Sequence, residues 1–125
     1  MKSHLISLFN MPKSLKSLTR LPKIIFFDFD GVFTDNKVFT TSDGTELVAS
    51  SKYDSQYLSF FRRNHQNILF YVISSEVNSS ITKRCEKLNV PVVNGVSCKV
   101  LAAEEILNHH GLEFYDAFFM FNDIN

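Results

Sequence analysis

Short apolar runs alternate with stretches of helical periodicity along most of this chain. Four runs rich in Ile, Val and Phe, each followed by polar residues, are typical of strands buried on both faces of a sheet. They lie at residues 24–27, 68–73, 90–93 and 117–121. Three helices are predicted between them, at 54–63, at 79–88 behind a capping Asn78, and at 99–109 before Gly111. This alternation predicts an α/β fold with a central parallel sheet and right-handed crossovers.

The spacing of apolar residues also predicts which helical side chains face the core. Each predicted face repeats at three or four residues, as one side of an α-helix does. In the first helix these residues are Tyr57, Leu58, Phe60 and Phe61, and in the third they are Val100, Ala103, Ile106 and Leu107.

Two β-prone runs, 36–41 and 46–50, flank the sequence Asp43-Gly44 directly after the first predicted strand. Asp-Gly between such runs predicts a β-hairpin. The hairpin carries more apolar residues than a freely exposed ribbon should, namely Val38, Phe39, Leu47 and Val48. We therefore expect it to cover a site or to pair with another subunit.

Two carboxylates, Asp28 and Asp30, follow the first apolar run, with Gly31 and Thr34 after them. Proteins of the α/β class place ligands at the carboxyl ends of parallel strands. Charge beside a core is costly unless a cation or hydrogen bonds compensate it. An isolated Asp-x-Asp is most simply an acidic turn. The apolar run, the glycine and the threonine together favour a functional site.

These four residues resemble motif I of the haloacid dehalogenase (HAD) superfamily, Asp-x-Asp-Gly-x-x-Thr after a hydrophobic strand. The resemblance implies that Asp28 attacks phosphorus and that Asp30 acts as general acid and base. A carboxylate nucleophile agrees with this, because an aspartyl-phosphate divides hydrolysis into two easier steps. The resemblance also implies a HAD-like Rossmannoid three-layer sandwich whose central parallel sheet has the strand order 3-2-1-4.

The same resemblance implies the rest of the site. The phosphate-binding residues would be Ser74, Ser75, Lys99 and Gly31, and the Mg²⁺ ligands would be Asp28, Asp30, Asn122 and Asp123. Taken singly, a serine or an acid after a strand and a lysine at a helix start are common without any function. Their order along the chain favours the site.

A closer resemblance covers residues 23–125. The segments 28–35, 52–54 and 95–105, together with the hairpin, look like the 3-deoxy-D-manno-octulosonate 8-phosphate phosphatase family, and the HAD module of N-acylneuraminate cytidylyltransferases is similar. The family implies a small domain without a large cap and a tetramer assembled through the hairpin 37–50. It also implies Mg²⁺-dependent hydrolysis of a phosphorylated sugar acid, of the octulosonate or nonulosonate type, in polysaccharide biosynthesis.

Several positions depart from this family pattern by the loss or change of a charged residue. They are Glu76 in place of Arg after motif II, Tyr53-Asp54-Ser55 in place of Arg-Asp-Gly, Cys98 in place of Asp before Lys99, and Phe121-Asn122-Asp123-Ile124-Asn125 without the usual final Asp. The domain over 23–125 is therefore interpreted as abbreviated at its C-terminus. The alternative function is a catalytically impaired HAD module that oligomerises through its hairpin.

The composition and net charge limit the kinds of partner that this protein is expected to bind. Thirteen basic and thirteen acidic residues give a net charge of zero, which does not favour nucleic-acid binding. No apolar run is long enough to span a membrane. Two cysteines without a pairing motif are interpreted as reduced thiols of a cytoplasmic protein. Residues 1–22 carry basic residues and no acid, and we interpret them as a leader that is poorly ordered.

Two other classes use similar residues. A response-regulator receiver domain also has Asp, Ser or Thr, and Lys in that order. Its phosphoacceptor ends a middle strand, however, and no acid ends the second or third strand here. A glycosyltransferase Asp-x-Asp would need a preceding nucleotide-binding domain. Both interpretations are rejected in favour of the phosphatase.

Overall fold

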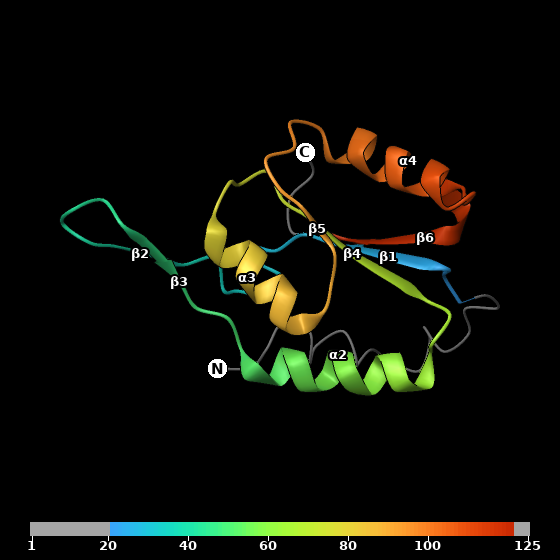
Figure 1. The fold of residues 1–125 in the computed structure, drawn as a ribbon, viewed down its shortest axis with the longest axis horizontal. Helices are drawn as coiled ribbons and strands as arrows, with labels where there is room; N and C mark the ends of the chain where they lie inside the picture. The colour runs from blue at the N-terminus through green and yellow to red at the C-terminus, as the bar shows by residue number, and fades with distance from the viewer. Residues whose placement is uncertain (1–20, 122–125) are drawn as a thin grey trace.

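The computed structural model describes residues 21–121, which form three layers. Helix α4 (Lys99–His109) covers one face of a parallel sheet, and α2 (Lys52–Asn64) and α3 (Ser79–Leu88) cover the other (Figure 1). The interpretation of residues 1–22 as a leader falls almost entirely outside the described residues. So do the expected metal ligands Asn122 and Asp123.

The sheet has four parallel strands in the order β5-β4-β1-β6, which confirms the predicted order 3-2-1-4. The strands are β1 (Ile24–Phe27), β4 (Leu69–Ile73), β5 (Val92–Val93) and β6 (Ala117–Met120). Strand β1 is central and buried throughout, and it pairs with β4 on one side and β6 on the other. Its carboxyl end therefore opens between two neighbouring strands, which is where Asp28 follows.

Alternate side chains of β1 belong to two separate cores. Ile24 and Phe26 pack with the α4 residues Ala103 and Leu107. Ile25 and Phe27 pack with a larger cluster that includes Leu58 of α2 and Ile81 and Cys85 of α3. Since successive residues of a strand point to opposite faces, one short apolar run serves both layers.

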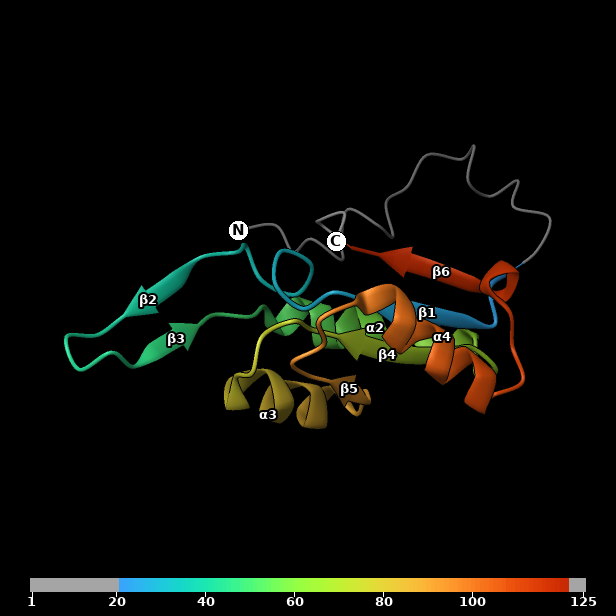
Figure 2. The same cartoon turned by 90° about the horizontal axis from the view of Figure 1, so that it is seen from above.

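The predicted hairpin is confirmed. Strands β2 (Val38–Thr40) and β3 (Glu46–Val48) pair antiparallel, and Gly44 adopts a φ of +84° in the turn between them. The hairpin projects away from the three layers (Figures 1 and 2). Phe39 and Leu47 are partners across it and are 64% and 54% exposed.

Two predicted core positions are wrong. Phe60 of α2 and Val100 of α4 are exposed. Helix α2 begins at Lys52, capped by the Ser51 hydroxyl, and buries residues at i and i+4, Asp54 and Leu58. In α4 the buried residues are Lys99, Ala103 and Leu107, so a charged side chain occupies the inward place that was expected for Val100.

The length and apolar character of the helices show whether any of them could cross a membrane. Within residues 21–121, no helix combines the length and the apolar character that a membrane crossing requires.

The corrected face of α2 can be tested by a matched pair of truncations. Leu58→Ala should lower the free energy of unfolding by about 2–5 kcal/mol, because it leaves a cavity in the core. Phe60→Ala on the same helix should change it by less than about 0.5 kcal/mol. Urea denaturation with an unchanged m-value is the measurement. Equal losses in the two variants would show that Phe60 faces the core after all.

Candidate active site

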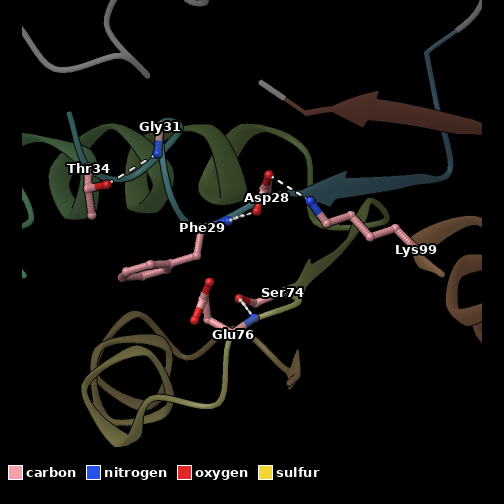
Figure 3. A network of polar contacts seen from close by, with 7 residues as sticks. All are labelled: Asp28, Phe29, Gly31, Thr34, Ser74, Glu76 and Lys99. Carbon is pink, nitrogen blue, oxygen red and sulfur yellow. Dashed lines mark hydrogen bonds and ion pairs between the residues drawn. The ribbon is translucent and has the colours of Figure 1, made fainter. Parts of the chain in front are cut away.

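Three of the expected site residues, Asp28, Ser74 and Lys99, lie near the carboxyl ends of the sheet strands (Figure 3). Asp28 directly follows β1, and Ser74 directly follows β4. Lys99 opens α4 and reaches the same place from the other layer. The Asp28 N–H donates to the Met120 carbonyl at 3.0 Å, so hydrogen bonding to β6 continues one residue beyond β1.

The centre of the site is a buried ion pair between Asp28 and Lys99. Lys99 Nζ lies 2.9 Å from Asp28 Oδ2, and the two residues are 3% and 4% exposed. The Phe29 N–H donates to Asp28 Oδ1 at 2.8 Å, so each carboxylate oxygen has a partner. Lys99 Nζ also lies 5.4 Å from the ring centroid of Phe121. Because each carboxylate oxygen has two lone pairs, Asp28 keeps capacity for a further ligand.

The loop after Asp28 is held by Thr34, which is buried. Its hydroxyl oxygen accepts hydrogen bonds from the N–H groups of Gly31, at 3.2 Å, and Asn36, at 3.1 Å. Gly31 adopts a φ of +79°, which a residue with a Cβ disfavours. The motif I threonine therefore fixes a tight turn. The Gly31 N–H, predicted to bind phosphate, donates to this hydroxyl in the structure.

Asp30 is half-buried in the same loop. Burial raises the pKa of its carboxyl above the ordinary value, and the negative charges of Asp28 and Glu76 raise it further, against a smaller opposing effect of Lys99. Asp30 therefore keeps its proton to higher pH than an exposed aspartic acid does. That property suits a side chain that has to donate a proton.

The segment 74–76 follows β4 at the carboxyl end of the sheet. Ser74 is 1% exposed, and its hydroxyl oxygen accepts a hydrogen bond from the Glu76 N–H at 3.1 Å. Backbone bonds from Ser74 N–H to the Val93 carbonyl and from Val96 N–H to the Ser74 carbonyl fix it further. The hydroxyl proton of Ser74 can still be donated to a ligand. Ser75, the other predicted phosphate ligand, is exposed.

Glu76 was not among the predicted site residues. Its carboxylate is close enough to raise the pKa of Asp30, and Figure 3 shows it beside Ser74, on the side of the loop that faces Asp28 and Phe29. The available signal was its position two residues after a serine that ends a strand. A charge there, at the open end of the sheet, could have been included.

The residues partly fit a hard divalent cation. Within residues 21–121, no three His, Cys, Asp or Glu side chains are grouped as metal ligands. Of the expected ligands, Asp28 and Asp30 lie within the described residues, and both offer oxygen donors of the kind that Mg²⁺ prefers. The charges of Asp28 and Glu76 both raise the pKa of Asp30, and a cation beside these groups would offset that repulsion.

The fold was compared with those of known proteins. No protein-family model matches the sequence. Among solved structures, a hypothetical protein from Xanthomonas campestris matches with a TM-score of 0.80 at 28% identity, covering 99% of this chain and 65% of the other. A 3-deoxy-D-manno-octulosonate 8-phosphate (KDO 8-phosphate) phosphatase from Moraxella catarrhalis, in complex with magnesium, phosphate and KDO, matches with a TM-score of 0.72 at 21% identity, covering 78% and 56%.

A cobalt-bound phosphatase of the same activity from Haemophilus influenzae matches with a TM-score of 0.69 at 18% identity, covering 78% of this chain and 57% of the other. The chain is thus structurally similar to HAD superfamily KDO 8-phosphate phosphatases across most of its length, at low identity. It spans between 56% and 65% of the length of these three structures.

The central ion pair can be tested by a double-mutant cycle. Lys99→Met should lower the free energy of unfolding by about 3–5 kcal/mol in metal-free buffer, because it leaves the Asp28 charge buried without its partner. Adding Asp28→Asn should recover part of that loss. Lys23→Met is the control, since Lys23 pairs with Asp116 at 3.7 Å while largely exposed, and it should cost less than about 1 kcal/mol. Strictly additive losses at Asp28 and Lys99 would contradict the pair.

Proposed function

We propose that this chain is a Mg²⁺-dependent phosphomonoester hydrolase that works through an aspartyl-phosphate. The observation that carries the proposal is the buried Asp28–Lys99 pair, beside the Ser74 hydroxyl at the open end of the sheet. An ion pair that served only to stabilise the fold would not need to be buried at the carboxyl ends of the strands. A nucleophile that meets a phosphate dianion needs a fixed cation and a hydrogen-bond donor next to it.

Asp28 attacks phosphorus with a carboxylate oxygen. The new O–P bond forms while the bond from phosphorus to the ester oxygen breaks, and Asp30 gives its proton to that oxygen. Lys99 and Ser74 hold the phosphoryl oxygens, with the Ser75 hydroxyl as a further donor, whereas the Gly31 N–H is engaged by the Thr34 hydroxyl. In the second step Asp30 takes a proton from a water molecule that attacks the aspartyl-phosphate. Inorganic phosphate then leaves and the Asp28 carboxylate is restored.

Mg²⁺, when bound, supplies positive charge that offsets the negative charge of the phosphate against the site carboxylates. Asp28, the Asp30 carbonyl, and Asn122 or Asp123 would hold it. All are oxygen donors, in keeping with the preference of this ion.

The proposed substrate is a small phosphorylated sugar acid of the octulosonate or nonulosonate type. The support is the structural similarity to KDO 8-phosphate phosphatases, one of them in complex with KDO and phosphate. The proposed setting is cytoplasmic polysaccharide biosynthesis.

The second candidate is a HAD module that assembles through its hairpin without turnover. The exposed apolar residues of β2 and β3 favour it, because exposed apolar side chains on a projecting hairpin are typical of a protein–protein contact. Assembly and catalysis are compatible, so phosphate release decides between the candidates.

Phosphate release from a panel of sugar-acid phosphates tests the proposal. The wild type should release phosphate with Mg²⁺ and lose this activity with a chelator. Asp28→Asn should retain less than about 1% of the turnover, because an amide is a poor nucleophile at phosphorus. Glu86→Gln, an exposed change on α3, should leave turnover unchanged. Turnover that survives Asp28→Asn would refute the assignment, and a wild type without turnover would favour the second candidate.

The hairpin should hold a homo-oligomer together, and a tetramer is the expected form. Light scattering at micromolar concentration should give a multiple of the 14.4 kDa chain mass. The double variant Phe39→Asp/Leu47→Asp should shift that mass toward the monomer, because it places charge in an apolar contact. Phe60→Asp is the control, since Phe60 is equally exposed but lies on α2. A monomeric wild type would contradict the expectation.

A further inference from the structure

A groove lies beside the second half of α4 and the loop that leads from this helix to β6. Its volume is about 170 Å³. Lys99 begins α4 at the candidate active site, so the groove is toward the other end of the helix. The residues that line it are Glu104, Leu107, Asn108, Leu112, Glu113 and Phe114.

The lining of the groove combines apolar surface with negative charge. Leu107 is buried, whereas Phe114 is 45% exposed although its ring stacks on that of Phe119 in β6, with the centroids 6.0 Å apart. Glu104 and Glu113 are exposed, and among the ion pairs within residues 21–121 none includes either of them. A partner with both cationic and apolar side chains fits such a surface.

The two layers that cover the sheet differ in charge. Helices α2 and α3 together contain six basic residues against two acids, Asp54 and Glu86. Residues 99–116, which include α4 and the loop after it, contain four acids against one lysine, Lys99, and that lysine is paired with Asp28. A basic partner is therefore attracted to the α4 side of the molecule and repelled from the opposite side.

The chain itself contains a basic and apolar stretch in residues 1–20, here called the basic segment. It has no acid, whereas residues 21–125 carry nine basic and thirteen acidic residues. Apolar side chains, among them Leu15 and Leu18, lie between the basic ones. The basic residues of the segment are Lys2, Lys13, Lys16 and Arg20. Its composition therefore complements both the charge and the apolar lining of the groove.

The basic segment joins the fold next to the groove. The Lys23 N–H donates to the Asp116 carbonyl at 2.8 Å, two residues after Phe114. Figure 1 shows the chain entering β1 at the same end of the sheet as the turn between α4 and β6. Residues 16–23 can span up to about 24 Å when extended, and the 11 residues of α4 span about 16 Å. Lys16 can therefore reach the groove.

We propose that the basic segment docks in the groove of its own chain. Its basic side chains lie beside Glu104 and Glu113, and its apolar side chains pack against Leu107 and Phe114. A tethered occupant is favoured over a separate molecule, because a short linker gives it an effective concentration on the order of millimolar. The inference does not depend on the proposed phosphatase activity.

Zero-length cross-linking of the full chain tests the proposal. A carbodiimide joins a lysine amine to a carboxylate that lies in contact with it, as an amide with loss of water. Peptide mass spectrometry should find Lys13 or Lys16 joined to Glu104 or Glu113, in preference to Glu86 on α3. In about 0.5 M salt the yield should fall about threefold or more, because salt screens exposed charges.

Trypsin provides a second measurement, because a docked segment is cleaved more slowly after Lys13, Lys16 and Arg20. The double variant Glu104→Gln/Glu113→Gln should raise the initial rate of these cleavages about threefold or more, since it removes two attractive charges. The control is Glu86→Gln/Glu105→Gln, which removes the same charge from exposed residues outside the groove and should leave the rate unchanged.

A mixture of ¹⁴N- and ¹⁵N-labelled protein distinguishes docking within one chain from docking between copies. Cross-links that join peptides of the same label support the proposal. Cross-links that join a light peptide to a heavy one would give the groove to a second copy and overturn it. Equal cross-linking to Glu86 and to the groove, no cross-link to the groove, or equal cleavage rates in the two double variants would overturn it as well.

Discussion

The arrangement of this protein depends on one buried ion pair, in which Lys99 meets Asp28 at 2.9 Å across a sequence separation of 71 residues. Removing two charges from water is costly, so such a pair persists only where geometry and further hydrogen bonds compensate. Here Asp28 follows β1, and Lys99 begins α4 in the layer that covers one face of the sheet. The Phe29 N–H donates a hydrogen bond to the other carboxylate oxygen of Asp28. The pair therefore ties the sheet to its covering helix at the point where chemistry would occur.

The ion pair also gives Asp28 a different environment from that of Asp30. Both carboxyls are at least partly buried, but Asp28 has the Lys99 cation at 2.9 Å. Burial and then the negative charges of Asp28 and Glu76 raise the pKa of Asp30. Two carboxylates two residues apart thus have different environments, as a nucleophile and a proton donor require. Thr34 and Gly31 maintain this difference, because the turn that they form fixes Asp30 in relation to β1.

Much of this architecture could be predicted from the sequence. Four apolar runs and the capping residues located the strands and helices, and the motif I resemblance gave the strand order. Phe60 and Val100 were misplaced, because several faces of a short helix carry apolar residues and only packing decides which is buried. Burial of Lys99 and the orientation of Glu76 could not be predicted. Both depend on which distant segments come together in the fold. The hydrophobicity pattern does not show that these two charged residues lie near the carboxyl ends of the strands.

The proposed activity requires that Asp28 becomes phosphorylated, and this species can be trapped chemically. Borohydride reduces an acyl phosphate to an alcohol, so a phosphorylated aspartate becomes homoserine, which peptide mass spectrometry detects. The protein is mixed with substrate and Mg²⁺, quenched in acid and reduced. Homoserine is expected at position 28, with none in a sample without substrate. Turnover with an unreduced Asp28, or homoserine at another aspartate, would contradict it.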